Sequence, residues 1–175
     1  MLAEPITIKS FDPIAHENCT VLILGTMPGN QSLEQNQYYG HPDNVFWDIM
    51  IRVLLPNITE QEIDGLTYAD KEGLLLQNDI ALWDVLQYCS RSGNLDSKIR
   101  NEIKNDIETF VAGHNKIRKV IFNGQKAEKY FDSCFKHLIE QHGLTKIVLP
   151  STSSSHSLNA FKKLRQWRAE ITGRT

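Results

Sequence analysis

Four short runs of apolar residues constrain the fold of this chain more than any other feature. They span residues 20–24, 80–83, 120–122 and 146–149. The runs are almost continuously apolar, as expected of strands that are buried on both faces. Apolar residues at helical spacing predict helices at residues 44–55, 99–111, 125–135 and 158–171. Strands that alternate with helices predict a parallel α/β sheet covered by helices on both faces.

The chain has 175 residues, with no internal repeat and no low-complexity linker, which predicts a single domain over residues 1–175. Lys and Arg together number 19 and Asp and Glu number 21, so the formal net charge is −2. This balance excludes a strongly basic protein that coats nucleic acid. It does not exclude a local basic face that binds nucleic acid.

The three cysteines, Cys19, Cys89 and Cys134, form no CxxC motif and no paired Cys/His spacing. A disulfide scaffold, a zinc ribbon and a Cys-ligated iron–sulfur cluster are therefore not expected, and we predict no cofactor and no metal. No apolar run approaches the length of a membrane span, about 18 residues, and residues 1–12 lack the apolar core of a signal peptide. We therefore expect a cytoplasmic protein, or a nuclear one in a eukaryote, with no membrane partner.

Parallel α/β sheets bind ligands at the loops that follow the carboxyl ends of their strands. Here those loops begin at Gly25, Asp84, Asn123 and Pro150. Glycines at positions 25 and 29 of the first loop let backbone N–H groups approach a ligand closely. On its own this loop is more simply interpreted as a tight turn, because it matches neither GxGxxG nor a Walker A loop.

The segment YYGHPDNVFW at residues 38–47 contains more side chains that can bind a ligand than the first loop does, because it combines two tyrosines with a His and an Asn. Asp43 or Asn44 can cap the helix that follows, and Phe46 with its neighbouring Trp fits a protein core. Core packing is less natural for Tyr38 and Tyr39, because they precede a polar loop. An aromatic ring beside an amide and a His suits a pocket that stacks a planar ring.

The segment LPSTSSSHS at residues 149–157 lies between the last predicted strand and the last predicted helix. Hydroxyl groups and backbone N–H groups in that place can bind phosphate oxygens. Four basic residues follow in the helix: Lys162, Lys163, Arg165 and Arg168. For these four, an ordinary solvated helix face is as good an interpretation as phosphate contact.

Together these motifs resemble the uracil-DNA glycosylase superfamily, and most closely its hypoxanthine (deoxyinosine) DNA glycosylase family. The resemblance runs from about residue 22 to residue 167 and rests on GTMPG, YYGHPDNVFW, ALWDVL followed by CSRSGNLDS, VIFNG and LPSTSSSHS. It implies a three-layer α/β/α sandwich with a mainly parallel four-stranded sheet. It also implies a repair enzyme that hydrolyses the N-glycosidic bond of a deaminated base flipped out of DNA.

The resemblance also implies site residues. Many members of the superfamily activate water with an Asp or Asn at the place of Met27, which cannot polarise water, so the catalytic role is expected to fall to Asn44. Tyr39 is expected to stack on the base. The expected base pocket consists of Gly25, Thr26, Met27, Pro28, Tyr39, Phe46, Asp84 and Asn123. The expected DNA-contacting residues are Ser151, Thr152, Ser153, Ser154, Ser155, His156, Lys162 and Lys163. Ser154 and Ser155 stand where the resemblance leads us to expect Pro-Ala.

Hypoxanthine is the expected base, with uracil and xanthine left open. The expected partner is DNA that contains such a base, bound by a monomer. Two alternatives remain at this point. One is a non-catalytic module of the same fold that binds DNA, and the other is a serine hydrolase that uses His156. The second is weaker, because the sequence has no GxSxG motif.

Overall fold

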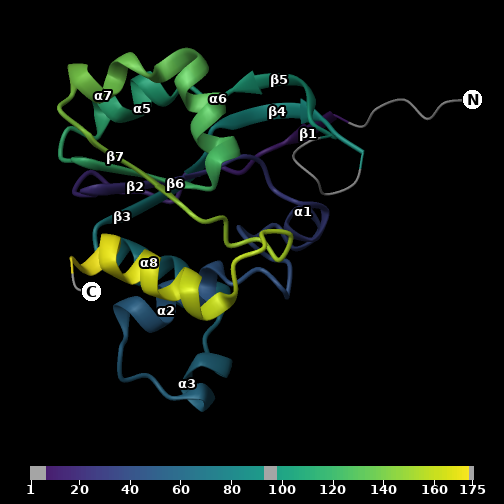
Figure 1. Ribbon diagram of the computed structural model, residues 1–175, viewed down its shortest axis with the longest axis vertical. Coiled ribbons are helices and arrows are strands. Elements are labelled where there is room, and N and C mark those ends of the chain that lie inside the picture. The colour runs from purple at the N-terminus through teal and green to yellow at the C-terminus, as the bar shows by residue number, and fades with distance from the viewer. Residues whose placement is uncertain (1–6, 93–97, 174–175) are drawn as a thin grey trace, which may run out of the picture.

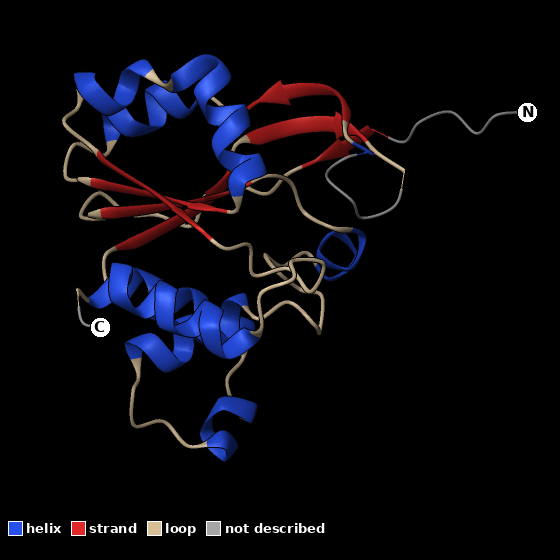
Figure 2. Cartoon of the chain, in the orientation of Figure 1, coloured by secondary structure: helices blue, strands red, loops and turns tan. Residues whose placement is uncertain are grey.

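The computed structural model describes residues 7–92 and 98–173, arranged in three layers (Figures 1 and 2). The middle layer is a four-stranded sheet of order β3-β2-β6-β7 in which every neighbouring pair is parallel. Its strands are β2 (Val21–Gly25), β3 (Ile80–Asp84), β6 (Lys119–Asn123) and β7 (Thr145–Leu149). Helices cover both faces of this sheet (Figure 2). The prediction of an α/β/α sandwich around four parallel strands is confirmed.

Successive residues of the central strands enter two separate cores. Leu22 and Leu24 pack in one core, and Ile23, between them, packs in the other. The first core lies under α5 (Ile107–Gly113), α6 (Gln125–Phe135) and α7 (His137–Gln141). The second lies under α2 (Phe46–Leu54), α4 (Tyr68–Gln77) and α8 (Ala160–Thr172). Burial on both faces explains why the strands are continuously apolar.

Three of the four predicted helices form close to their predicted bounds. Helix α6 has the predicted bounds, while α2 and α8 each begin two residues later than predicted. Asn159 caps α8, because its side chain accepts a hydrogen bond from the backbone N–H of Lys162 at 2.9 Å. The sequence did not predict α4 or three shorter helices, α1 (Asn30–Gln35), α3 (Glu60–Asp64) and α7. The leucines of α4 are consecutive, so they carry no helical spacing.

The helix predicted at residues 99–111 is wrong. Its first half is strand β5 (Arg100–Lys104), which joins β1 (Thr7–Lys9) and β4 (Leu86–Ser90) in a small antiparallel sheet of order β1-β4-β5. Helix α5 starts only at Ile107, after Asp106 caps it by accepting from the backbone N–H of Thr109 at 3.0 Å. Isoleucines recur every four residues in this segment, and this spacing is also the one expected for the buried face of a helix.

Asn105 explains why the chain turns where that helix was expected to continue. Its side chain is buried, and its Nδ2 donates to the backbone oxygens of Asp84 at 2.8 Å and Leu86 at 3.2 Å. These bonds hold the junction between β3 and β4 in place. At the same junction, the N–H of Val85 donates to the oxygen of Gly25 at 2.9 Å, which fixes the start of the loop after β2. The edge of the sheet is therefore rigid where a ligand is expected.

No helix within residues 7–92 and 98–173 is long and apolar enough to cross a membrane.

Candidate active site

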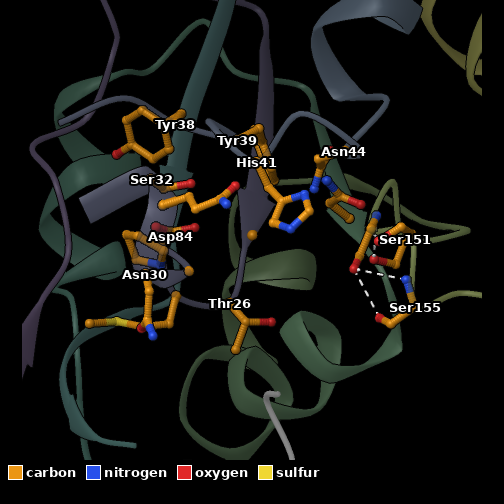
Figure 3. A pocket seen from close by; sticks show the side chains of 18 residues that line it. Thr26, Asn30, Ser32, Tyr38, Tyr39, His41, Asn44, Asp84, Ser151 and Ser155 are labelled. Carbon is orange, nitrogen blue, oxygen red and sulfur yellow. Dashed lines mark hydrogen bonds between the residues drawn. The ribbon is translucent and has the colours of Figure 1, made fainter. Parts of the chain in front are cut away.

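A cavity of about 360 Å³ lies at the carboxyl ends of the parallel strands (Figure 3). The loop after β2, the segment after α1, the ends of β3 and β6, and residues 151–157 (the serine loop) all contribute to its walls. The site residues expected from the sequence that line it are Gly25, Thr26, Met27, Pro28, Tyr39, Asn44, Asp84, Asn123, Ser151, Ser153, Ser154 and Ser155. Segments that are far apart in the sequence thus meet at one cavity.

Glycine is required at the start of the first loop. A Cβ atom at Gly25 would lie 2.5 Å from Oδ1 of Asp84 and 2.6 Å from the hydroxyl oxygen of Tyr39. Only a residue without a side chain allows these two groups to meet there. The far side of the same loop is held by the buried Arg91, whose Nη2 donates to the backbone oxygen of Pro28. The loop is therefore a fixed wall of the cavity.

Tyr39 presents an aromatic face to the cavity. Its ring is stacked on Phe46 with 4.1 Å between centroids and 28° between planes. Phe46 is fully buried and does not line the cavity, so its expected place in the base pocket is corrected to that of a support behind Tyr39. Phe46 supports one face of the ring, and Tyr39 lines the cavity.

The backbone of Tyr39 is strained, with φ at 53°. A left-handed conformation at a non-glycine residue costs about 1–3 kcal/mol and persists only where its surroundings enforce it. Here the preceding residue is anchored twice: Tyr38 accepts from Nε1 of Trp47 at 2.7 Å, and its hydroxyl donates to the oxygen of Asp12 at 2.8 Å. Burial, and after it the charge of Asp84, raise the pKa of Tyr38, so its hydroxyl stays a donor. The Tyr39 ring is thus held in place before any ligand arrives.

Asn44 has its carbonyl oxygen fixed in orientation. Oδ1 accepts from the backbone N–H of Phe46 at 3.0 Å, and the Asn44 backbone N–H donates to the oxygen of His41 at 2.9 Å. A carbonyl oxygen has two lone pairs, so one remains for a further donor such as water. The side chain lines the cavity beside His41 (Figure 3).

His41 lines the cavity, although it is not among the site residues expected from the sequence. Its Nδ1 accepts from the backbone N–H of Asp43 at 3.1 Å. In the neutral ring this leaves the proton on Nε2, which makes His41 a hydrogen-bond donor at the cavity wall. The GHP motif offered a sequence indication, since a His held between Gly and Pro sits in a fixed turn.

The serine loop is held in place by Asn123 at the end of β6. The amide of Asn123 donates to Oγ1 of Thr152 at 2.9 Å and accepts from the backbone N–H of Thr152 at 2.9 Å. Thr152 is fully buried, so its expected DNA contact is corrected to a structural role. The backbone oxygen of Thr152 also accepts from the N–H of Val45 at 3.1 Å, which ties the serine loop to the start of α2.

Lys163 also supports the serine loop from inside. It is only 3% exposed, and its Nζ donates to the backbone oxygen of Ser153 at 2.8 Å. Burial lowers the pKa of its ammonium group. The expected phosphate contact at Lys163 is therefore wrong, because the residue lies on the inner face of α8, one turn before the buried Trp167. Lys162, by contrast, is exposed.

The rim of the serine loop is polar and exposed at Ser154, Ser155 and His156. The hydroxyl groups of Ser153 and Ser155 are 2.9 Å apart and hydrogen bonded (Figure 3). Nδ1 of His156 accepts from the backbone N–H of Leu158 at 3.2 Å. Among the described residues no serine hydroxyl is hydrogen bonded to a histidine ring, so the structure gives no support to a serine hydrolase.

Loss of the Asn123 clamp is expected to lower stability. Asn123→Ala removes both hydrogen bonds between the Asn123 side chain and the buried Thr152. A buried polar group left without its hydrogen-bond partner costs about 1–3 kcal/mol. Thr152→Val is the matched control, since it loses one of the two bonds and is expected to show a smaller loss. Urea denaturation measures both, and an Asn123→Ala protein as stable as wild type would contradict the clamp.

Within the parts of the chain that the structure describes, no group of three or more His, Cys, Asp or Glu side chains is arranged to hold a metal ion. The motif CSRSGNLDS at residues 89–97 extends beyond those parts, since its last five residues lie outside the described residues.

Comparisons with known proteins agree with this geometry. The family model of the Uracil DNA glycosylase superfamily matches residues 12–172. A protein of Methanosarcina acetivorans named hypoxanthine DNA glycosylase is 34% identical over 161 residues, covering 92% of this chain and 96% of the relative. A protein of the same name from Methanosarcina barkeri is 34% identical over 148 residues, covering 84% and 87%. The solution NMR structure of a candidate uracil DNA glycosylase from M. acetivorans superposes with a TM-score of 0.79 at 32% identity, covering 96% of this chain and 98% of that one.

Proposed function

The chain belongs to the uracil DNA glycosylase superfamily, and from this we propose that it is a DNA glycosylase that removes hypoxanthine from DNA. The observation that carries the proposal is one cavity in which a supported aromatic ring, a carboxyl group and an oriented amide face the same space. The names of the two relatives favour hypoxanthine over other deaminated bases. A flipped base would stack on Tyr39, which leaves its edge to be read by the end of β3.

Asp84 is the group that we assign to reading the edge of the base. It is buried at the end of β3, and its Oδ1 lies against Gly25 beside the Tyr39 hydroxyl. A carboxylate oxygen accepts the ring N–H that hypoxanthine, uracil and xanthine all carry next to a carbonyl group. Adenine has a ring nitrogen without a hydrogen at that place. This nitrogen and the Asp84 oxygen are both hydrogen-bond acceptors and would repel each other. Deamination of adenine thus creates the donor that this cavity accepts.

Asn44 is the group that we assign to the attacking water. In the reaction, the N-glycosidic bond breaks and the base leaves with the bonding electron pair, while water adds to C1′ of the deoxyribose. The water loses one proton to leave a hydroxyl group on C1′, and the base takes up one proton from solvent, so the net reaction is hydrolysis. The sugar passes through an oxocarbenium-like state that water attacks readily, so orienting the water matters more than activating it. The remaining lone pair of Asn44 Oδ1 supplies that orientation.

His41 is the group that we assign to the leaving base. The bond from the Asp43 backbone fixes the ring so that Nε2 carries the proton. That N–H can donate to an oxygen or nitrogen of the base as negative charge develops there, which stabilises the transition state.

The direct test uses oligonucleotides of one sequence that carry inosine, uracil or xanthine at a single position. After incubation with the protein, alkali cleaves any abasic site, and strand breaks are read on a denaturing gel. The proposal predicts breaks at inosine that exceed those at uracil and xanthine. Binding to the inosine duplex without breaks would instead indicate a non-catalytic module.

Binding to DNA is expected to depend on salt through exposed cations at the start of α8. Charge reversal at Lys162 and Arg165 should weaken binding to inosine-containing and normal duplexes alike, because phosphate contacts carry no base information. Each lost phosphate contact is expected to reduce the slope of log K against log salt by about 1. Reversal of Lys129 and Lys136, which are exposed on the opposite helical layer, changes the net charge equally and is the control. Equal effects of the two double variants would contradict a DNA face at α8.

A further inference from the structure

The serine loop is poorly built to fill the space that a flipped base leaves in a DNA stack. Proteins that open a base step insert a large apolar side chain as a wedge. The exposed rim of this loop offers only the hydroxyl groups of Ser154, Ser155 and Ser157 and the ring of His156, which is turned back onto the backbone of Leu158. None of these exposed groups is a large apolar side chain.

Phe161 supplies a large apolar side chain next to the loop. It is the second residue of α8 and is 68% exposed, more than any other large hydrophobic side chain among residues 7–92 and 98–173. The first turn of α8 follows the serine loop directly (Figure 1). An aromatic ring left in water at this place contributes nothing to the core, and it is accessible to an external partner.

The direction of Phe161 follows from the buried Lys163. Two residues along a helix correspond to a rotation of about 200°, so Phe161 projects from the face opposite to Lys163 and away from the protein. Side chains on a helix also lean toward its N-terminus. The ring of Phe161 is therefore inclined toward the residues that precede α8, which connect it to the serine loop. The serine loop in turn lines the cavity through Ser155.

Two arginines continue the same face of the helix. Arg165 and Arg168 follow Phe161 at i+4 and i+7, which places all three in one row. Arg165 is exposed and Arg168 is half-buried, and neither pairs with a carboxylate among the described residues. An apolar ring followed by two available guanidinium groups complements a base stack flanked by phosphates.

We propose that Phe161 is the wedge of this enzyme: in the complex with duplex DNA its ring enters the base stack beside the flipped nucleotide, while Arg165 and Arg168 contact the flanking phosphates. This inference rests on the proposed function. It transfers the expected gap-filling role from Ser154 and Ser155 to the helix that follows them.

The test compares excision of hypoxanthine from duplex and single-stranded DNA under single-turnover conditions. A wedge matters only where a stack must be held open. Phe161→Ala is therefore expected to slow excision from the duplex by about 10-fold, in the range for loss of one base–aromatic stack, and to leave the single strand unaffected. Phe161→Leu keeps a large apolar side chain and should restore most of the rate. Ile103→Ala, at a 57% exposed side chain on the distant β5, should change neither rate.

A second readout does not depend on catalysis. In a duplex with 2-aminopurine next to inosine, opening of the stack raises the fluorescence, so wild type should raise it on binding and Phe161→Ala should not. An equal fluorescence rise with both proteins, or equal loss of rate on both substrates, would overturn the wedge. Absence of any excision by wild type on either substrate would overturn the proposed function instead, while the fluorescence result would still decide on the wedge.

Discussion

Asn44→Ala is expected to lose most of the excision activity, by roughly 100-fold or more, because misplacement of a reacting group alone costs about that factor. The physical reason is the single oxygen that the fold orients: Oδ1 is held by the Phe46 N–H at 3.0 Å and lines the cavity, where Met27 on the first loop has no polar group to replace it. The fold should survive, since loss of a helix-end bond of this kind costs about 1 kcal/mol. Single-turnover excision from an inosine duplex measures the rate, and thermal unfolding checks the fold.

Two further variants separate the roles of Asn44. Asn44→Ser keeps a short side chain whose hydroxyl can accept from the Phe46 N–H at the start of α2, so it should be nearly as stable as wild type and still inactive. Asn44→Asp keeps the acceptor and adds a negative charge that stabilises the oxocarbenium-like sugar, so its rate should equal or exceed that of wild type. A folded Asn44→Ala protein with full activity would reduce Asn44 to a structural residue that holds the start of α2.

Tyr39→Ala is expected to slow excision by roughly 5- to 150-fold, which is the rate equivalent of the 1–3 kcal/mol typical of one base–aromatic stack. Tyr39→Phe should be nearly silent, because the ring is the group that stacks on the base. The support of Phe46 behind the ring remains in that variant. Steady excision rates for wild type, Tyr39→Ala and Tyr39→Phe test the assignment on one inosine duplex.

The strained backbone at Tyr39 offers a matched control. Tyr39→Gly also lacks the ring, but glycine adopts the left-handed conformation without strain. It should therefore be more stable than Tyr39→Ala and show the same defect in excision. If Tyr39→Phe were severely impaired, the hydroxyl that lies against Gly25 would be the functional group, and stacking would not explain the role of Tyr39.

The sequence predicted the central sheet well because strands buried on both faces are almost continuously apolar, and such runs are visible in the sequence. Strand β6 had to be apolar at every position between Lys119 and Asn123, since one core takes Val120 and Phe122 and the other takes Ile121. The rule that sites follow the carboxyl ends of parallel strands then selected the loops that form the cavity. Local chemistry and topology were sufficient for this part.

What the sequence did not predict depends on long-range contacts. Asn105 turns the chain through bonds to Asp84 and Leu86, some twenty residues away, and no local pattern shows such bonds. Lys163 is of a residue type that is usually exposed, yet its Nζ donates to the backbone oxygen of Ser153. Its position four residues before the buried Trp167 was the available indication, since residues at i and i+4 share a face.

The measurement that tests the central claim most directly is the release of free base from an inosine duplex. Wild type and Asn44→Ala are incubated with the duplex, and free hypoxanthine and abasic sites are quantified by chromatography in the same samples. The structure predicts that wild type releases hypoxanthine in a one-to-one ratio with abasic sites and that Asn44→Ala, although folded and bound to the duplex, releases almost none. Binding by wild type without release of hypoxanthine, or equal release by the two proteins, would contradict it.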